Sequence, residues 1–470
     1  MCLAVAVLVA AVGLRVAASC NALWLDEIWS LLLAEQVESP LEILTRFRVD
    51  NNHILNTFSL YWIGPGKPWI VYRLPAIIAG SLSVIAAAWI GARWGRVEKW
   101  TAMVLVAFSY LLIHYASEAR GYALVVLLAF TCYESLRRHL DGGRLKWGLL
   151  FAVCAATGML AHPMFAFCYL AAVYWSLTSW LTQRMAWRGI AIHGAICHGL
   201  PFSCGSLLYV FHLRGVELGG GPEYSFPNLL IETGSLALGG PQGGIAALLV
   251  SLIFGAGVVA GLRLLIRERA DAWTFFFIAV VLPMIQAMVA RPPFLFVRYF
   301  LISIAFGLLL CSLVLGRLFA RGRSGRLAYA LILLFFILGN LWHTVGLIQL
   351  GRGQYLEALA YMTTEDSSNV ITISSDHDHG NRMLVEFYAR DFAPARQIEY
   401  VDLAQWPQDP PGWLIIHQAR VWNAPPPRTS YEVSGTRYAL QRTFDCAKLS
   451  GWQWHCYRKK GSGAADKAAI

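Results

Sequence analysis

The sequence predicts a mainly α-helical polytopic membrane protein with a small α/β domain in its C-terminal part. Of its 470 residues, 57% are hydrophobic and only 14% are charged, whereas soluble proteins carry about 25% charged residues. Apolar runs of membrane-spanning length recur as far as residue 349, and alternating apolar and polar residues follow. The net charge of +10 does not indicate a nucleic-acid partner, because the basic residues fall in short clusters between the apolar runs.

About eleven runs are long enough to cross a bilayer. They lie at residues 2–19, 73–92, 100–114, 120–136, 147–161, 163–181, 189–211, 244–266, 272–290, 298–316 and 326–349. The first run has the length of a signal peptide. It lacks a preceding basic segment and a cleavage site of small residues, so we expect a retained first span.

Lysine and arginine predict the orientation of these spans. Sixteen of the 38 basic residues lie in five short loops, at 93–99, 137–146, 184–188, 263–269 and 317–326. Loops rich in Lys and Arg stay in the cytoplasm. The N-terminus is then inside, whereas the first loop and, with an odd number of spans, the C-terminal domain face outward. We therefore expect an integral protein of the bacterial inner (plasma) membrane with an extracytoplasmic active site.

The first outer loop, residues 20–72, is expected to belong to a transmembrane domain that covers residues 1–350. Its segments "DEIWSLLLAEQ", "PLEILTRFR" and "NHILNTFSLYWIG" each have apolar residues at helical spacing with polar residues between them. This pattern predicts short helices in the plane of the membrane interface. A loop of this length with helices of its own is typical of a functional segment.

Residues 351–460 are expected to form the extracytoplasmic α/β domain, followed by a disordered tail at 461–470. "NVITISS" and "GWLIIHQ" predict strands, and "NRMLVEFYARDF" predicts an amphipathic helix between them. "SSDHDHGN" has the composition of a metal site, but a solvated turn between strand and helix is the better interpretation. Cys446 and Cys456 could form a disulfide in an oxidising compartment or remain free thiols.

Two adjacent carboxylates, Asp26 and Glu27, follow the first span. One interpretation is helix capping, with Asp26 at the N-cap and Glu27 in the first turn. The other is catalysis, because a partly desolvated carboxylate is a stronger base toward a hydroxyl group. Charged residues at membrane depth are costly to insert, which favours a functional role for this pair.

Three arginines lie on the outer side, against the general orientation: Arg73, Arg120 and Arg298. Each stands at the outer start of a helix, where backbone N–H groups and the helix dipole favour anions. Together they predict a site for a phosphate group, with Tyr122 and Tyr299 as further donors. The alternative is that each arginine extends to the lipid headgroups.

His53 and His162 also fall on the outer side, and we expect them to bind substrate by hydrogen bonds. No fixed spacing of Asp, Glu and His predicts a metal site. The expected chemistry needs no obligatory cofactor, and a divalent cation stays an open alternative.

A carboxylate base and a phosphate site at one membrane face suit attack on a lipid-linked phosphate ester. The donor would be a polyprenyl-phosphate sugar lipid, and the acceptor hydroxyl would belong to a lipid, a glycan or a protein. One carboxylate acting as base, rather than as nucleophile, predicts inversion at the anomeric carbon. Two alternatives remain, a transporter or flippase of lipid-linked glycans and a scaffold for an envelope complex. Membrane lipids are further partners, and nucleic acid is not.

Six motifs in order resemble the GT-C membrane glycosyltransferases. They are "WLDEIWSL", "NNHILNTF", "YRLPAIIAGSL", "YASEARGYAL", "AHPMFAF" and "VRYFL", and they cover residues 20–310. The nearest branch is that of the dolichyl-phosphate-mannose protein mannosyltransferases and the aminoarabinose transferases of lipid A. Two departures are the absence of prolines around His53 and the glycine, Gly121, where proline is usual.

The resemblance implies transfer of a hexosyl or pentosyl group from a polyprenyl-phosphate donor at the non-cytoplasmic face. Its catalytic acidic pair falls on Asp26 and Glu27. The residues that we expect to bind the donor phosphate are Arg73, Arg120, Tyr122, Arg298 and Tyr299. Those that we expect to bind substrate are Asn52, His53, Glu118 and His162.

Overall fold

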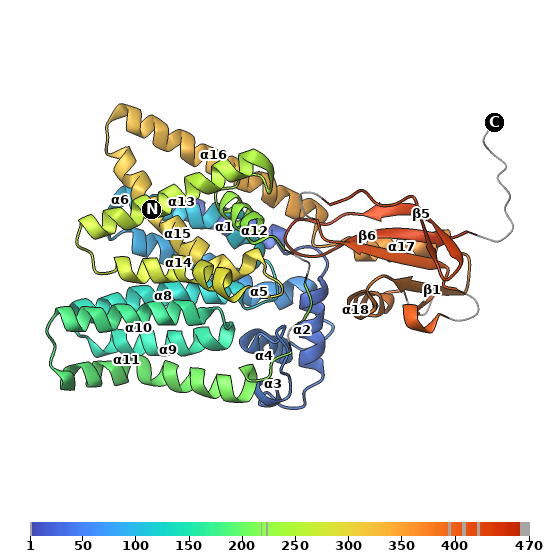
Figure 1. The fold of residues 1–470 in the computed structure, drawn as a ribbon, viewed down its shortest axis with the longest axis horizontal. Coiled ribbons are helices and arrows are strands. Elements are labelled where there is room, and N and C mark those ends of the chain that lie inside the picture. The colour runs from blue at the N-terminus through green and yellow to red at the C-terminus, as the bar shows by residue number, and fades with distance from the viewer. Residues whose placement is uncertain are drawn as a thin grey trace. The chain divides into compact units, whose positions relative to one another are not determined.

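The computed structural model describes residues 2–217, 219–221, 224–392, 396–406, 410–420 and 424–460. The predicted disordered tail therefore lies outside the described residues. The chain forms two compact units (Figure 1). The chain up to Cys20 and Ser30–Val345 make up the first unit, and Asn21–Trp29 and the chain from Gly346 onward make up the second.

The first unit is helical. Its helices are α1 (Cys2–Ala18), α3 (Glu42–Thr45), α4 (Ile54–Ile63), α5 (Trp69–Gly91), α6 (Arg96–Phe108), α7 (Tyr110–Ala116), α8 (Tyr122–Gly142), α9 (Leu145–Ala161), α10 (Phe165–Thr182), α11 (Trp187–Leu208), η1 (Tyr209–Leu213), α12 (Phe226–Ala237), α13 (Gly244–Arg267), α14 (Trp273–Ala290), η2 (Val297–Phe300) and α15 (Leu301–Phe319). Helices α2 (Leu25–Glu35) and α16 (Arg323–Leu350) each begin in one unit and end in the other. The interfacial helices expected in the first loop are present as α2, α3 and α4.

All eleven predicted apolar runs contain a helix, but the predicted number of spans is not confirmed. Within the described residues, seven helices are long and apolar enough to cross a membrane, or eight if a bent pair counts as one span. Helices α1 and α9 are apolar but shorter. The chain is an integral membrane protein by these helices and by its fold.

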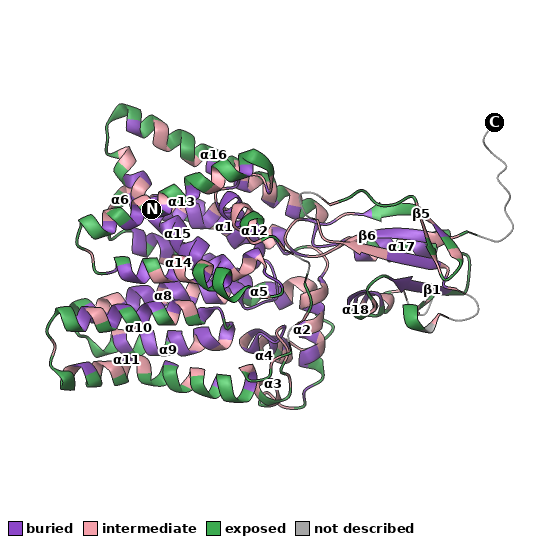
Figure 2. Cartoon of the chain, viewed as in Figure 1, coloured by how far each residue is buried: buried purple, intermediate pink, exposed green. Residues whose placement is uncertain are grey.

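Burial separates the inner helices from the outer ones (Figure 2). In the Val297–Phe319 span, 89% of the most apolar window is buried, whereas the share is 17% for Trp187–Leu213. Large apolar side chains such as Phe202, Leu252 and Trp342 are exposed on the outer helices. An exposed apolar surface of this kind is unfavourable in water and favourable against lipid.

The predicted run at 100–114 is not one straight helix. It breaks at Ser109, and α6 and α7 meet at an angle of 55°. In a continuous helix the Tyr110 N–H would donate to the Val106 carbonyl. Here the Tyr110 N–H donates instead to the side-chain oxygen of Asn340 at 2.6 Å. The break therefore leaves carbonyl groups in the last turn of α6 that need other donors.

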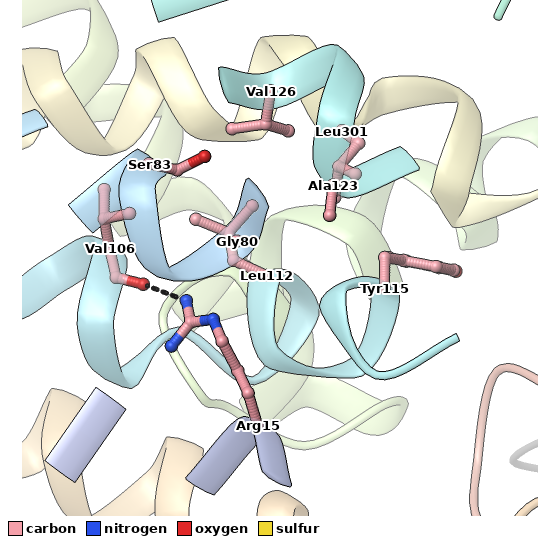
Figure 3. Close-up of a pocket in the computed structure, with 9 residues that line it drawn as sticks. All are labelled: Arg15, Gly80, Ser83, Val106, Leu112, Tyr115, Ala123, Val126 and Leu301. Atoms are coloured by element: carbon pink, nitrogen blue, oxygen red, sulfur yellow. Dashed lines mark hydrogen bonds between the residues drawn. The ribbon is translucent and has the colours of Figure 1, made fainter. Parts of the chain in front are cut away.

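Arg15 supplies those donors. Its guanidinium donates to the carbonyls of Val106 and Ala107, each at 3.2 Å, and only 1% of the residue is exposed. Figure 3 shows the bond to Val106 beside a small cavity, which has room for about one water molecule and is also lined by Gly80 and Tyr115. A buried cation from α1 thus holds the end of α6 in place.

Strands form the core of the second unit. Its sheet has the order β2-β1-β3-β6-β5-β4. The strands are β1 (Val370–Ser375), β2 (Gln397–Tyr400), β3 (Trp413–Gln418), β4 (Ser430–Val433), β5 (Thr436–Phe444) and β6 (Gln453–Lys459), and the helices are α17 (Tyr355–Glu365), α18 (Asp378–Ala389) and η3 (Leu403–Gln405). Strands β1, β2 and β3 are parallel, and the other pairings are antiparallel.

The expected elements of this unit are confirmed as β1, β3 and α18, with a turn at the segment "SSDHDHGN" between β1 and α18. The structure favours the second interpretation of Cys446 and Cys456, because both are free and buried thiols. Burial raises the pKa of Cys446 to about 12, so its thiol stays protonated at neutral pH.

We expect Arg15→Met to lower the thermal stability of the protein in detergent. The substitution keeps an unbranched apolar stem but leaves two buried carbonyls without their donors, at about 1–3 kcal/mol for each. The unfolding midpoint measures the effect, with Arg263→Met, which changes an exposed arginine of α13, as the control. Equal midpoints for the two variants would contradict the role of Arg15.

Candidate functional site

The two adjacent carboxylates of α2 have different environments. The Glu27 side chain is buried, and its Oε2 accepts a hydrogen bond from the Trp24 N–H at 3.2 Å. This contact caps the start of α2, in the manner of the glutamate of a capping box. The N-cap is thus Trp24 rather than Asp26, which corrects the capping interpretation. Asp26 lies in the first turn and is half-buried.

Arg120 joins three segments of the helical unit. It lies just before α8, and only 4% of the residue is exposed. Its guanidinium donates to Ser30 Oγ at 3.0 Å and to the Asn51 backbone carbonyl at 3.1 Å. It also donates to the Asn51 side-chain oxygen and lies 3.1 Å from Nε2 of His53. The buried charge therefore fixes the first loop against the start of α8.

His53, Tyr122 and His162 form an aromatic group beside Arg120. The centroids of the His53 and His162 rings are 4.4 Å apart, and Tyr122 lies 4.9 Å from His53 and 5.1 Å from His162. The Gly121 N–H donates to Nδ1 of His53 at 3.1 Å. A Cβ at residue 121 would come within 2.3 Å of the Ala161 carbonyl, so no larger residue fits here. This close approach explains why glycine replaces the usual proline.

The environment keeps both histidines neutral. Burial, followed by the Arg120 charge, lowers the pKa of His53 well below its usual value. Burial, Arg120 and Arg298 together lower the pKa of His162 to about 3. The charge of Arg298 therefore acts on the same group as the charge of Arg120. These histidines can donate and accept hydrogen bonds, but they do not add positive charge near neutral pH.

Arg298 and Tyr299 lie in η2, before α15, and both are half-buried. The Arg298 guanidinium lies 4.0 Å from the centroid of the Phe296 ring and 5.8 Å from that of Tyr299. Rings of this kind stabilise a cation without neutralising it. Arg298 thus keeps partial access to solvent, whereas Arg120 is covered by protein.

Two other predicted site residues, Arg73 and Asn52, make hydrogen bonds to nearby segments of the chain. The Arg73 guanidinium is buried and donates to the Ser19 carbonyl at 2.8 Å, directly after α1. Asn52 donates to the Ile43 carbonyl and accepts from the Thr57 hydroxyl, each at 2.9 Å. Arg73 thus contacts the chain directly after α1 and Asn52 contacts the first loop itself, and their roles in binding stay predictions.

Glu118 is fully buried and lies 3.2 Å from Nε2 of His114, one turn earlier. His114, Ser30 and Asn51 were not among the predicted site residues. Asn51 directly precedes Asn52 in "DNNH", and Ser30 lies four residues after Asp26. Their spacing from predicted site residues was the sequence signal that could have identified both as site residues. Among the described residues, no group of three or more His, Cys, Asp or Glu side chains could hold a metal ion.

The fold is similar to that of ArnT, an aminoarabinose transferase, from Cupriavidus metallidurans. The ArnT crystal structure bound to undecaprenyl phosphate has a TM-score of 0.55 at 13% identity, with 99% of each chain covered. The apo structure has a TM-score of 0.54 at 14% identity, with 88% of this chain and 92% of the ArnT chain covered. The apo oligosaccharyltransferase of Archaeoglobus fulgidus gives 0.46 at 12% identity, over 84% of this chain and 64% of that chain.

No protein-family model matches the sequence, and no curated protein matches it. The similarity to ArnT extends over the whole chain and includes the C-terminal domain. ArnT is a GT-C protein, so the resemblance predicted from the six sequence motifs is confirmed for the fold.

Acidification should destabilise the group around His162. The unfolded histidine takes up a proton near pH 6.5, whereas the folded one does so only at about 3. Its depressed pKa therefore adds stability above pH 6.5, which is lost as the pH falls, at roughly 1.4 kcal/mol per pH unit for one proton. We expect His162→Gln to show a smaller drop in unfolding midpoint than the wild type between pH 7.5 and 5. An equal drop would contradict the buried neutral state.

Proposed function

We propose that the protein is an inverting glycosyltransferase that moves a sugar from a polyprenyl-phosphate donor to an acceptor hydroxyl. The reaction takes place at the extracytoplasmic face of the plasma membrane, with Asp26 as the general base. The fold shared with ArnT, which has been crystallised with undecaprenyl phosphate, supports a lipid-linked donor. The positive-inside distribution of Lys and Arg supports the orientation.

One observation carries the assignment of Asp26. Glu27 is buried and accepts the capping bond from the Trp24 N–H, whereas Asp26 lies in the first turn of α2 and is half-buried. Residues four apart share a face of a helix, and Ser30, four residues after Asp26, accepts a hydrogen bond from Arg120. Asp26 therefore shares a face of α2 with Ser30, and we assign Glu27 to positioning.

The proposed step balances as a single displacement. Asp26 takes the proton of the acceptor hydroxyl, and the hydroxyl oxygen forms a bond to the anomeric carbon of the sugar. The bond between that carbon and the phosphate oxygen breaks, and polyprenyl phosphate leaves as an anion. A phosphate is a good leaving group, so no acid catalyst is obligatory. Because the two oxygens occupy opposite faces of the carbon, the configuration inverts.

The leaving phosphate needs positive charge that a ligand can reach. Arg298 and Tyr299 are half-buried, whereas Arg120 is committed to Ser30, Asn51 and His53. We therefore assign phosphate binding to Arg298, with Tyr299 as a further donor. The positive charge of Arg120 adds to the electrostatic potential at the phosphate, and its hydrogen bonds position the first loop. A guanidinium stabilises the phosphate charge as it develops in the transition state.

The proposal predicts that Asp26→Asn abolishes sugar transfer, because an amide cannot take the proton. Transfer from a polyprenyl-phosphate sugar is measured in reconstituted vesicles, together with membrane insertion, which should be normal. Asp50→Asn, a carboxylate of the same loop that is also half-buried, serves as the control and should keep activity. Full turnover by Asp26→Asn would remove Asp26 from the mechanism. Movement of the glycolipid across the vesicle membrane without a glycosidic product would support a flippase instead.

Arg298→Ala should weaken binding of the donor phosphate. A charge-assisted hydrogen bond contributes about 1.5–3 kcal/mol, which corresponds to a loss of roughly 10- to 150-fold in donor affinity. Affinity for polyprenyl phosphate is measured on the purified protein. Arg214→Ala, at an exposed arginine before the α12 segment, is the matched control. An unchanged affinity in Arg298→Ala would show that this guanidinium does not bind the donor.

A further inference from the structure

A group of exposed and half-buried side chains lies at one end of the mixed sheet of the second unit. We call it the switch patch, and it consists of Asp376, His377, His379, His417 and Trp452. The chain leaves β1 through α18 to β2 on one side, and then returns to β3 on the other side of β1. The patch lies where β1 and β3 end. In open α/β sheets, ligands bind at the carboxyl ends of the strands where the strand order reverses in this way.

The side chains of the patch are held by defined contacts. Asp376 Oδ1 accepts hydrogen bonds from Nδ1 of His417 at 2.8 Å and from the His417 backbone N–H at 3.1 Å. The Trp452 ring lies 4.4 Å from the ring of His417 and 5.3 Å from that of His377. These contacts link the end of β1, the end of β3 and the segment before β6.

The first turn of α18 makes room for the tryptophan ring. A Cβ at Gly380 would come within 2.5 Å of the Trp452 ring, so the indole lies directly against the backbone of this turn. The Gly380 N–H donates to Nδ1 of His377 at 3.2 Å, which caps α18. The patch is therefore preorganised by its own hydrogen bonds and close packing.

These contacts decide what the patch offers to a ligand. Because Nδ1 of His377 accepts a hydrogen bond, the neutral ring carries its proton on Nε2 and can donate there. Because Nδ1 of His417 donates to Asp376, the neutral His417 ring can accept at Nε2. Neither Nε2 has a hydrogen-bond partner among the described residues. The patch thus combines a donor, acceptors and the half-buried indole of Trp452.

This combination fits a sugar better than an anion. Each hydroxyl of a saccharide both donates and accepts, and the C–H face of its ring packs against an aromatic ring. An anion would meet the carboxylates of Asp376 and Asp378. The arginines that follow in α18 and after β3, Arg382 and Arg420, are each paired with a carboxylate, of Asp402 and Asp445.

The patch also adjoins the start of α2, all within the second unit. The ring of Trp29 lies 5.6 Å from that of His379, and Trp29 is three residues after Asp26. The Tyr388 hydroxyl of α18 donates to the Leu23 carbonyl at 2.5 Å. The Trp452 N–H donates to the Tyr355 hydroxyl at 2.9 Å. Helix α18 therefore carries part of the patch and also packs against the segment that holds Asp26.

We infer that the switch patch is an acceptor subsite that binds a neutral saccharide. The assignment of this saccharide as the acceptor rests on the proposed function. Binding at the patch would bring a hydroxyl of a sugar-containing acceptor toward Asp26. The C-terminal unit would then select the acceptor, while the helical unit holds the lipid-linked donor.

Direct binding tests this inference without any need for turnover. The full-length protein in lipid nanodiscs is mixed with neutral disaccharides (maltose, cellobiose and chitobiose), and saturation-transfer NMR detects the bound sugars. We expect a signal from at least one disaccharide, with at least a fivefold loss in Trp452→Ala. His417→Ala leaves the indole in place and should show a similar loss. A loss in both variants would not be explained by misfolding of Trp452→Ala alone.

Two control variants separate the possible outcomes. Tyr431→Ala changes a half-buried aromatic residue in β4, at the far edge of the sheet, and should keep the signal. Asp26→Asn should also keep it, because binding does not require the base. No signal from any disaccharide, equal signals in Trp452→Ala and the wild type, or displacement of the sugar by inorganic phosphate would each overturn the inference. If one of these binding results is obtained but Asp26→Asn still loses sugar transfer, the inference fails and the proposed function stands.

Discussion

The buried guanidinium of Arg120 is the contact on which the organisation of the first loop depends. It binds a helix through Ser30, a turn through Asn51 and the start of α4 through His53. A buried charge that loses its partners costs several kcal/mol, so these segments are stable only in the arrangement that surrounds it. The loop therefore has a defined structure, and its residues Ser30, Asn51 and His53 face a common centre.

Arginine makes two kinds of contact in the helical unit. Arg15 and Arg73 donate to carbonyls at or beyond helix ends and are almost completely covered. Arg298 lies against aromatic rings and remains half-buried. In a sequence, each of these arginines appears as a basic residue that interrupts an apolar run. That pattern is the same for both kinds of contact. Only the contacts distinguish an arginine that completes a helix from one that can meet a ligand.

The sequence predicted helices and strands correctly where the pattern of apolar residues within one segment is enough to define the element. Long apolar runs gave the helices, and the strongly apolar β1 and β3 were identified with α18 between them. It did not predict the break at Ser109, because the partners that make it possible, Arg15 and Asn340, are far away in sequence. Strands β2, β4, β5 and β6 were missed because their polar residues hide the alternation. His53 and His162 were predicted as separate site residues, and their ring contact beside Arg120 appears only in the fold.

The position of β6 sets the order in which the C-terminal unit can assemble. This strand, Gln453–Lys459, lies between β3 and β5 although it comes last among the strands of the described residues. The segment Asn21–Trp29 belongs to the same unit and is made more than 400 residues earlier. At about 5–20 residues per second, that segment waits roughly 20–90 s for the rest of its domain. The surroundings of the carboxylate at residue 26 are therefore complete only after β6 has been made, more than 400 residues later.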